Sequence, residues 1–262
     1  MTVTLPQALD FGAETEVLAA LCETLDATDW DRPTAFKGWT PRDILTHLDV
    51  WNRGADLAFT DPDAFADWMK PLADALMTGT LRTEEARKLG ARDARELLSG
   101  WRTHAAGMAE RWSHADPKTR VPWAGPSMSL RSSATARQME TWAHGQAIFD
   151  LMGVAREDTD RVANVVHMGV QTFGWSYQVR GRPVPEAMPE LALTLPSGAT
   201  LNYGEAGPAG RIAGPAVAFA QVVAQTRNVA DTELEVTGPV ATEWMSIAQC
   251  FAGPPVDPPA PG

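Results

Sequence analysis

The sequence predicts an α+β protein, in which a bundle of four helices precedes a small domain of mixed helices and strands. Residues from about 8 to 152 read as long amphipathic helices joined by polar loops. From about residue 160 onward, short stretches of alternating apolar and polar residues appear between helical segments. We therefore expect a helical domain over 1–152, an accessory domain over 160–252, and a proline-rich, disordered tail over 253–262.

The first two helices of the bundle follow from apolar spacing and from one clear start signal. The first is expected over about 8–25. At the start of the second, Thr40 suits the N-cap and Pro41 the first helical position. Asp43 follows at the position of a capping-box acid, in the positive first turn of the helix. The second helix is therefore predicted to begin at residue 41.

The third and fourth helices complete the predicted bundle. A long polar loop is expected over about 61–82, followed by a helix from about 83 to 112. The fourth helix is expected over about 132–151. Gly153 lies near the position at which a glycine commonly ends a helix. Helices of these lengths suit a four-helix bundle.

The second region begins with a predicted helix over about 161–179 and continues with a hairpin. Leucines alternate with other residues before a Pro-Ser-Gly turn at 196–198, and the alternation resumes after it. A short strand is expected at 234–236. The segment 212–227 fits either a strand or a helix. The last helix is indicated by apolar residues at helical spacing: Val240, Trp244, Ile247, Ala248 and Phe251.

Composition excludes several classes of partner. The formal net charge is -11 and no cluster of lysines and arginines occurs, which argues against nucleic acids and anionic membranes. No apolar run is long enough to span a membrane. Asp10, Glu14 and Glu16 interrupt any signal-like stretch, so we expect a cytoplasmic location. Two cysteines without metal-type spacing, Cys22 and Cys250, are interpreted as small buried side chains.

Three residues on two predicted helices point to a metal site. His47 lies inside the apolar stripe of the second helix, between Ile44 and Trp51. Glu140 and His144 are four residues apart on the fourth helix, so their side chains project from the same face. Burying a carboxylate on an apolar face is costly, and a divalent metal would compensate for that cost.

This ligand set is typical of catalytic metal sites. Three protein ligands leave a coordination position for water or substrate, and two imidazoles with one carboxylate suit Zn²⁺, while Fe²⁺ and Ni²⁺ use similar sets. A plain Glu140–His144 ion pair and an ordinary core histidine explain the same pattern without a metal. Spacing alone does not establish that the second and fourth helices face each other.

Two stretches carry a resemblance to a known family. Residues 38–48, GWTPRDILTHL, resemble the second-helix signature of DinB-like bundle proteins and, more narrowly, of the mycothiol-dependent maleylpyruvate isomerases. Residues 137–146, RQMETWAHGQ, resemble the fourth-helix motif of those isomerases. The resemblance implies a DinB-like bundle in which His47, Glu140 and His144 bind zinc, with mycothiol as a cosubstrate.

The resemblance extends to the C-terminal region, with one departure. Residues 234–239 and 244–253 are similar to the sterol-carrier-like α+β accessory domain of a branch of uncharacterised metal-binding proteins. In the isomerases an arginine of the second domain assists the substrate, which implies this role for Arg227. The family motif often continues with an aspartate where this chain has Ala147. An acid there could orient a ligand or contact substrate, so an identical activity is in doubt.

Three functional hypotheses follow. In the first, a metal-bound low-molecular-weight thiol adds to a small electrophilic substrate, giving an isomerase or a transferase. In the second, the metal activates water or a carbonyl without a thiol, giving a hydrolase, lyase or cyclase. In the third, the protein binds an apolar ligand without catalysis, with Trp123, Trp142 and Trp175 around it. Trp123 and Trp142 are also the candidate cofactor-binding residues. The substrate and the oligomeric state stay open.

Overall fold

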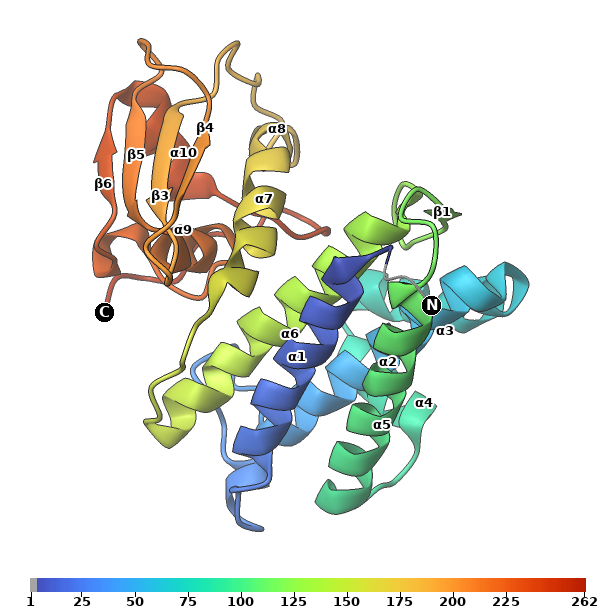
Figure 1. The fold of residues 1–262 in the computed structure, drawn as a ribbon. Coiled ribbons are helices and arrows are strands. Elements are labelled where there is room, and N and C mark those ends of the chain that lie inside the picture. Colours follow the sequence, from blue (N-terminus) through green and yellow to red (C-terminus); the bar gives the residue numbers. More distant parts are fainter. Residues whose placement is uncertain (1–3) are drawn as a thin grey trace. The chain divides into compact units, whose positions relative to one another are not determined.

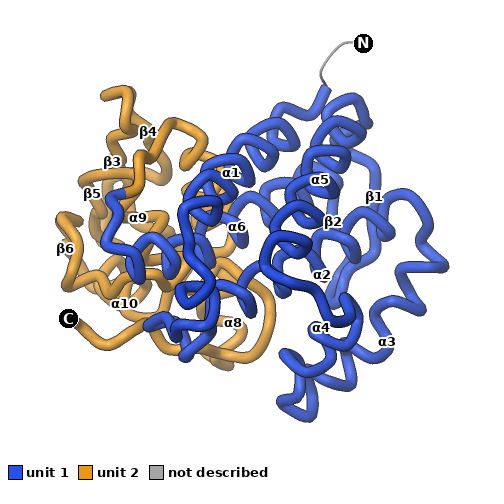
Figure 2. The backbone as a smooth tube through the Cα atoms, turned by 90° about the horizontal axis from the view of Figure 1, so that it is seen from below, with its two compact units in different colours: residues 1–155 blue, residues 156–262 orange. Residues whose placement is uncertain are grey.

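The computed structural model of the chain describes residues 4–262. The chain divides into two compact units, residues 1–155 and 156–262 (Figure 2). The first unit is helical apart from a two-stranded ribbon, and the second combines a four-stranded sheet with helices (Figure 1). The predicted α+β class is confirmed. Within residues 4–262, no helix has the length and apolar character needed to cross a membrane.

Four long helices form the bundle of the first unit. They are α1 (Pro6–Cys22), α2 (Pro41–Thr60), α5 (Ala94–Ser113) and α6 (Leu130–Met152). Both α1 and α2 pack against α5 and α6 (Figure 1). The interior is filled by large apolar side chains that are fully buried, and this burial is the main stabilising contribution. They include Phe11, Leu18, Ile44, Leu48, Trp101, Trp112 and Ile148.

The start of α2 is fixed by the predicted capping box. The Thr40 hydroxyl accepts a hydrogen bond from the Asp43 backbone N–H at 3.2 Å, and the Asp43 carboxylate accepts one from the Thr40 N–H at 2.9 Å. These bonds satisfy two backbone donors that a helix start otherwise leaves unpaired. They determine where α2 begins, and therefore which side of the helix His47 occupies.

The predicted loop over 61–82 is wrong. This segment contains α3 (Pro62–Thr78) and the start of α4 (Leu81–Leu89). The apolar side of α3 buries Phe65, Met69 and Leu72, and its start is capped by the Asp61 carboxylate. Acidic residues and Pro71, which lies inside the helix, obscured this period in the sequence.

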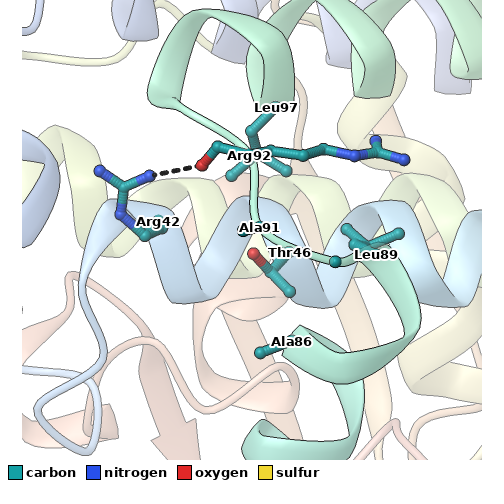
Figure 3. Close-up of a pocket in the computed structure, with 8 residues that line it drawn as sticks. Arg42, Thr46, Ala86, Leu89, Ala91, Arg92 and Leu97 are labelled. Carbon is teal, nitrogen blue, oxygen red and sulfur yellow. Dashed lines mark hydrogen bonds between the residues drawn. The ribbon is translucent and has the colours of Figure 1, made fainter.

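The predicted single helix over 83–112 is also wrong, because it is broken between α4 and α5. Gly90 has a positive φ of 68° after the end of α4. A second capping box, formed by Asp93 and Glu96, then starts α5. Arg42 of α2 donates to the Arg92 carbonyl in this turn at 3.4 Å (Figure 3). The break lets α4 pack against α2 and α3 rather than extend α5.

The fourth helix is close to its predicted bounds. A short ribbon precedes it, in which β1 (Arg120–Val121) pairs antiparallel with β2 (Met128–Ser129). Ser129 caps the N-terminus of α6. Gly153 ends the helix in the left-handed conformation at φ 64°, as its position indicated.

The sheet of the second unit has the strand order β4-β3-β5-β6. The predicted hairpin is confirmed: β3 (Glu190–Thr194) and β4 (Thr200–Tyr203) are antiparallel. The ambiguous segment 212–227 contains both structures, because β5 (Arg211–Pro215) runs parallel to β3 and leads directly into a helix, α9 (Ala216–Val223). The short strand β6 (Glu235–Thr237) pairs antiparallel with β5.

Two helix predictions for the second unit need correction. The expected helix over 161–179 is divided into α7 (Ala163–Gln171) and α8 (Phe173–Gln178). Thr172 separates them, with its hydroxyl donating to the Met168 carbonyl at 2.8 Å. The last helix, α10 (Pro239–Ile247), ends before Phe251, because Ala248 adopts an extended conformation. The one-turn 3-10 helices are η1 (Asp29–Asp31), η2 (Asp160–Val162) and η3 (Val229–Asp231).

The tail after residue 252 has no helix or strand, as its proline content indicated. It is nevertheless hydrogen-bonded to the second unit. The Val256 carbonyl accepts from Gln225 at 2.7 Å, and the Pro259 carbonyl accepts from Asn228 at 2.8 Å. Composition alone predicted disorder and gave no sign of these partners.

Candidate metal centre

The three predicted ligands lie together in the first unit. His47 comes from α2, while Glu140 and His144 come from α6, which packs against it. One nitrogen or oxygen atom of each lies within 4.8 Å of the others. Within residues 4–262, no other group of three His, Cys, Asp or Glu side chains meets this condition. The packing of α2 on α6 therefore supplies the proximity that the sequence left open.

The donor atoms are spaced as a divalent ion requires. The Glu140 Oε2 atom lies 3.1 Å from His144 Nε2 and 3.7 Å from His47 Nε2. A tetrahedral zinc ion with ligands about 2.0–2.2 Å away places neighbouring donor atoms about 3.3–3.6 Å apart. The observed spacings bracket this value, so the donor set fits such an ion. Between 12 and 21% of the surface of each of the three side chains is exposed to solvent, so the site is accessible from outside.

Glu85 orients one of the histidines. Its Oε1 atom lies 2.7 Å from His47 Nδ1 and also accepts a hydrogen bond from Trp51 Nε1 at 2.7 Å. A proton on Nδ1 that is held by this carboxylate leaves Nε2 free to donate its lone pair. Such a carboxylate–histidine pair is the usual support of a metal-binding imidazole. Glu85 was not predicted, since it lies in a polar run of α4 and reaches His47 only through the fold.

Aromatic rings enclose the histidines. The Trp39 ring stacks parallel to that of His144, with the ring centroids 5.7 Å apart, and meets His47 edge-on at 5.2 Å. Phe36 meets His144 edge-on at 5.0 Å. Both rings come from the turn before α2, in which Lys37 and Gly38 have positive φ values. The turn thus places two apolar rings against the imidazoles of His47 and His144.

Arg137 adds a buried positive charge beside the carboxylate. It lies one turn before Glu140 on α6 and is only 3% exposed. Its Nη2 atom is 3.8 Å from Glu140 Oε1, and its guanidinium lies 5.1 Å from the ring centroid of Trp123. The motif that carried the family resemblance includes this arginine, but the sequence gave no indication of its burial.

The pKa values of the three candidate ligands depend on one another. Burial lowers the pKa of His47, but hydrogen bonds with Glu140 and Glu85 outweigh burial and raise it to about 9. Burial raises the pKa of Glu140, whereas both histidines and Arg137 hold it well below its usual range. Burial keeps the pKa of His144 below its usual value, although Glu140 opposes this effect. Without a metal, the site therefore holds an ionised Glu140, a charged His47 and a neutral His144.

The other predicted site residues are distributed differently. Trp123 contacts the Trp51 and Phe65 rings in the first unit, near Arg137. Trp142 leaves α6 roughly 200° around the helix from Glu140, so it projects from a different side. Arg227 lies in the second unit, where its Nη1 atom donates to the Thr226 carbonyl at 2.7 Å. Trp175, also in that unit, donates to the Phe251 carbonyl.

A separate cavity lies beside the α4–α5 turn (Figure 3). Its volume is about 320 Å³. None of the candidate ligands lines it, so it is distinct from the metal centre. Its lining consists of Arg42, Thr46, Ala86, Leu89, Gly90, Ala91, Arg92 and Leu97.

Comparison with known proteins gives the family. The family described as "Mycothiol maleylpyruvate isomerase N-terminal domain" matches residues 11–149, which is more than half of the chain. The chain belongs to this family. As a family member it is 36% identical over 250 residues to uncharacterized proteins from two strains of Mycobacterium tuberculosis, CDC 1551 / Oshkosh and ATCC 25618 / H37Rv. The alignment covers 95% of this chain and 96% of each relative.

Solved structures agree with this assignment at the level of the fold. The family member described here is similar to a crystal structure of the mycothiol-dependent maleylpyruvate isomerase, with a TM-score of 0.56 and 13% identity. The similarity covers 90% of this chain and 96% of the other. A histidine-to-alanine mutant of that isomerase gives a TM-score of 0.51 at 15% identity, over 85% and 91% of the two chains. The predicted family resemblance is thus confirmed, and the fold extends over both units.

Proposed function

We propose that this member of the mycothiol maleylpyruvate isomerase family is a divalent-metal-dependent enzyme that uses a low-molecular-weight thiol on a small electrophilic substrate. Zinc is the metal that the donor set favours. The observation that carries the proposal is the convergence of His47, Glu140 and His144, with Glu85 behind His47. The similar solved structures, described as mycothiol-dependent, support mycothiol as the thiol.

The residues of the chain have separate tasks in this proposal. His47, Glu140 and His144 would hold the ion, which when bound lowers the pKa of a thiol at its open position. Glu85 keeps the His47 ring turned so that Nε2 faces the site. Phe36 and Trp39 pack against the His144 ring and hold it in place.

The cysteines of the chain support a thiol from outside. Cys22 is buried, and burial raises the pKa of its thiol to about 12, so it is not a nucleophile near neutral pH. Cys250 is buried in the other unit. A thiol-dependent reaction at the metal centre therefore takes its thiol from a cosubstrate.

Two further assignments belong to the proposal. Trp123 lies beside Arg137 and is proposed to line the cofactor-binding site. Trp142 is not assigned to that site, because it projects from another side of α6. Arg227 is proposed to assist the substrate, as the family resemblance implies. Replacing Arg227 with alanine should then lower turnover and leave the metal content unchanged.

The first test is the metal content of protein purified without an affinity tag. We expect about one divalent ion per chain, its loss in His47→Ala, and its retention in His167→Ala, which removes an exposed histidine of the second unit. The cobalt-substituted protein should change its ligand-field spectrum when mycothiol is added. Absence of metal after reconstitution would overturn the proposal, and turnover without any thiol would replace it with thiol-free metal catalysis.

A further inference from the structure

The buried guanidinium of Arg137 has N–H groups that are not hydrogen-bonded within the described part of the protein. Its Nε and Nη1 atoms are buried and have no hydrogen-bond partner among residues 4–262. A buried guanidinium is costly unless its N–H groups are paired. Such a charge is retained where a ligand completes the pairing.

The neighbouring carboxylates do not accept hydrogen bonds from these N–H groups. The Glu140 Oε2 atom faces His144 and His47, and its Oε1 atom is 3.8 Å from Arg137, beyond hydrogen-bond distance. Glu85 is engaged by His47 and Trp51. Glu140 therefore faces Arg137 at Nη2 only as a distant ion pair, and among residues 4–262 no side chain accepts a hydrogen bond from Arg137 Nε or Nη1.

The surroundings of Arg137 suit a planar anion. The Trp123 ring lies against the guanidinium, and this contact leaves the N–H groups at the guanidinium edge available. A carboxylate receives two parallel hydrogen bonds either from Nε with Nη2 or from Nη1 with Nη2, so each of the two unpaired atoms has Nη2 as the second donor of its pair. Because Glu140 is one turn further along α6, an anion bound here would lie next to the three candidate metal ligands.

The charge balance of the site also favours an anion. With a divalent ion bound and both imidazoles neutral, the ion and Arg137 together carry three positive charges. Glu140 and Glu85 supply two negative charges, which leaves the enclosed site net positive. One negative charge, on a thiolate at the ion or on a ligand group at Arg137, balances this excess.

We propose that Arg137 binds a carboxylate group of the small-molecule substrate and thereby positions the reactive part of that molecule at the metal centre. This inference rests on the proposed function for the reaction, but the anion site itself belongs to Arg137 and exists without the metal. It places a substrate contact in the first unit, in addition to the role proposed for Arg227 in the second.

The test measures binding of succinate and of its neutral diamide to the full chain by titration calorimetry, with and without metal. Four proteins are compared: wild type, Arg137→Gln, Arg137→Lys and Arg131→Gln, which removes an exposed arginine of the same helix. Wild type and Arg131→Gln should prefer succinate over the diamide. Arg137→Gln should bind succinate at least about tenfold more weakly, with unchanged metal content, and Arg137→Lys should lie between them.

The outcomes separate this inference from the proposed function. Equal affinity for succinate and the diamide in the wild type would overturn it, and so would an unchanged succinate affinity in Arg137→Gln. If Arg137→Gln does not fold, the succinate affinity of Arg137→Lys tests the inference instead. Lysine keeps the positive charge but lacks the paired N–H donors of the guanidinium. A wild type that takes up no metal after reconstitution, yet prefers succinate through Arg137, would overturn the metal-dependent function and support the anion site.

Discussion

At the scale of single residues, both ring nitrogens of His47 matter to the candidate metal centre: Nε2 as the metal ligand and Nδ1 as the atom that orients the ring. Glu85 holds Nδ1, and only the remaining Nε2 faces Glu140 and His144. The three ligands could be predicted from helical faces, because each lies at a regular position on its own helix. Glu85 could not, because its contact with His47 joins residues 38 positions apart and no local pattern marks it.

Replacing Glu85 with glutamine should weaken metal binding by about 10–100-fold, because the neutral amide no longer holds the Nδ1 proton with a full charge. The measurement is competition for zinc with a chelator of known affinity. Glu110→Gln, which changes an exposed glutamate of α5, should leave zinc affinity unchanged. Equal zinc affinity in wild type and Glu85→Gln would show that His47 is oriented by other contacts.

Metal binding should release a proton from His47. In the metal-free protein, burial lowers the pKa of His47, but Glu140 and Glu85 raise it to about 9. Zinc needs the neutral ring, so its apparent affinity should rise about tenfold per pH unit up to pH 9 and then level off. Calorimetry in buffers of different ionisation enthalpy should detect close to one proton at pH 7.5. A pH-independent affinity would contradict the assigned charge state.

The raised pKa of His47 also determines whether the unfolding free energy of the metal-free protein rises or falls with pH. The pKa of His47 is raised above its unfolded value, so its contribution to stability is fully present below about pH 6.5. This contribution is lost as the pH rises through about 9. In His47→Ala, the unfolding free energy should lack this particular decline.

Cys22 should be unreactive in the folded protein. Its thiol is buried, and burial raises its pKa to about 12, which suppresses the reactive thiolate. Treatment with a chromogenic disulfide reagent should label Cys22 slowly in native buffer and rapidly in denaturant, as peptide mapping can show. Rapid native labelling of Cys22 would mean that α1 opens locally, and would remove one argument for an external thiol.

At the scale of elements, the residues that cap helices predicted helix boundaries better than the apolar spacing inside the helices did. The start of α2 and the glycine after α6 follow from capping chemistry, which acts locally. The sequence pattern missed α3, which buries only four residues and contains an internal proline. It also missed the break at Gly90, because a glycine near polar residues is compatible with a continuous helix. Yet this break places Glu85 against α2.

Loss of the α2 cap should destabilise the first unit without altering the ligands. Thr40→Ala removes the hydroxyl that accepts the Asp43 N–H and should reduce the unfolding free energy by about 1 kcal/mol. Denaturant unfolding of metal-free protein measures this difference. Thr103→Ala, at an exposed position of α5, should change it little. A Thr40→Ala variant as stable as wild type would show that tertiary contacts alone fix the start of α2.

At the scale of the whole molecule, the two units have different relations to the proposed chemistry. All candidate metal ligands, Glu85 and Arg137 belong to residues 1–155, whereas Arg227 belongs to residues 156–262. The family match at 11–149 covers the first of these groups, while the relatives and solved structures extend over both units. The donor atoms of the candidate metal site and of the proposed anion site therefore all belong to the first unit.

Metal binding should consequently protect the first unit selectively against hydrogen exchange. An ion at about 100 times its dissociation constant stabilises the state that binds it by about 2.7 kcal/mol. Because the ligands lie on α2 and α6, their amides should exchange more slowly in the zinc-loaded full-length protein. Amides of β3 and β5 should exchange at the same rate with and without zinc, and His47→Ala should show no zinc effect. Equal slowing in both units would instead mean that the metal stabilises the chain as one cooperative body.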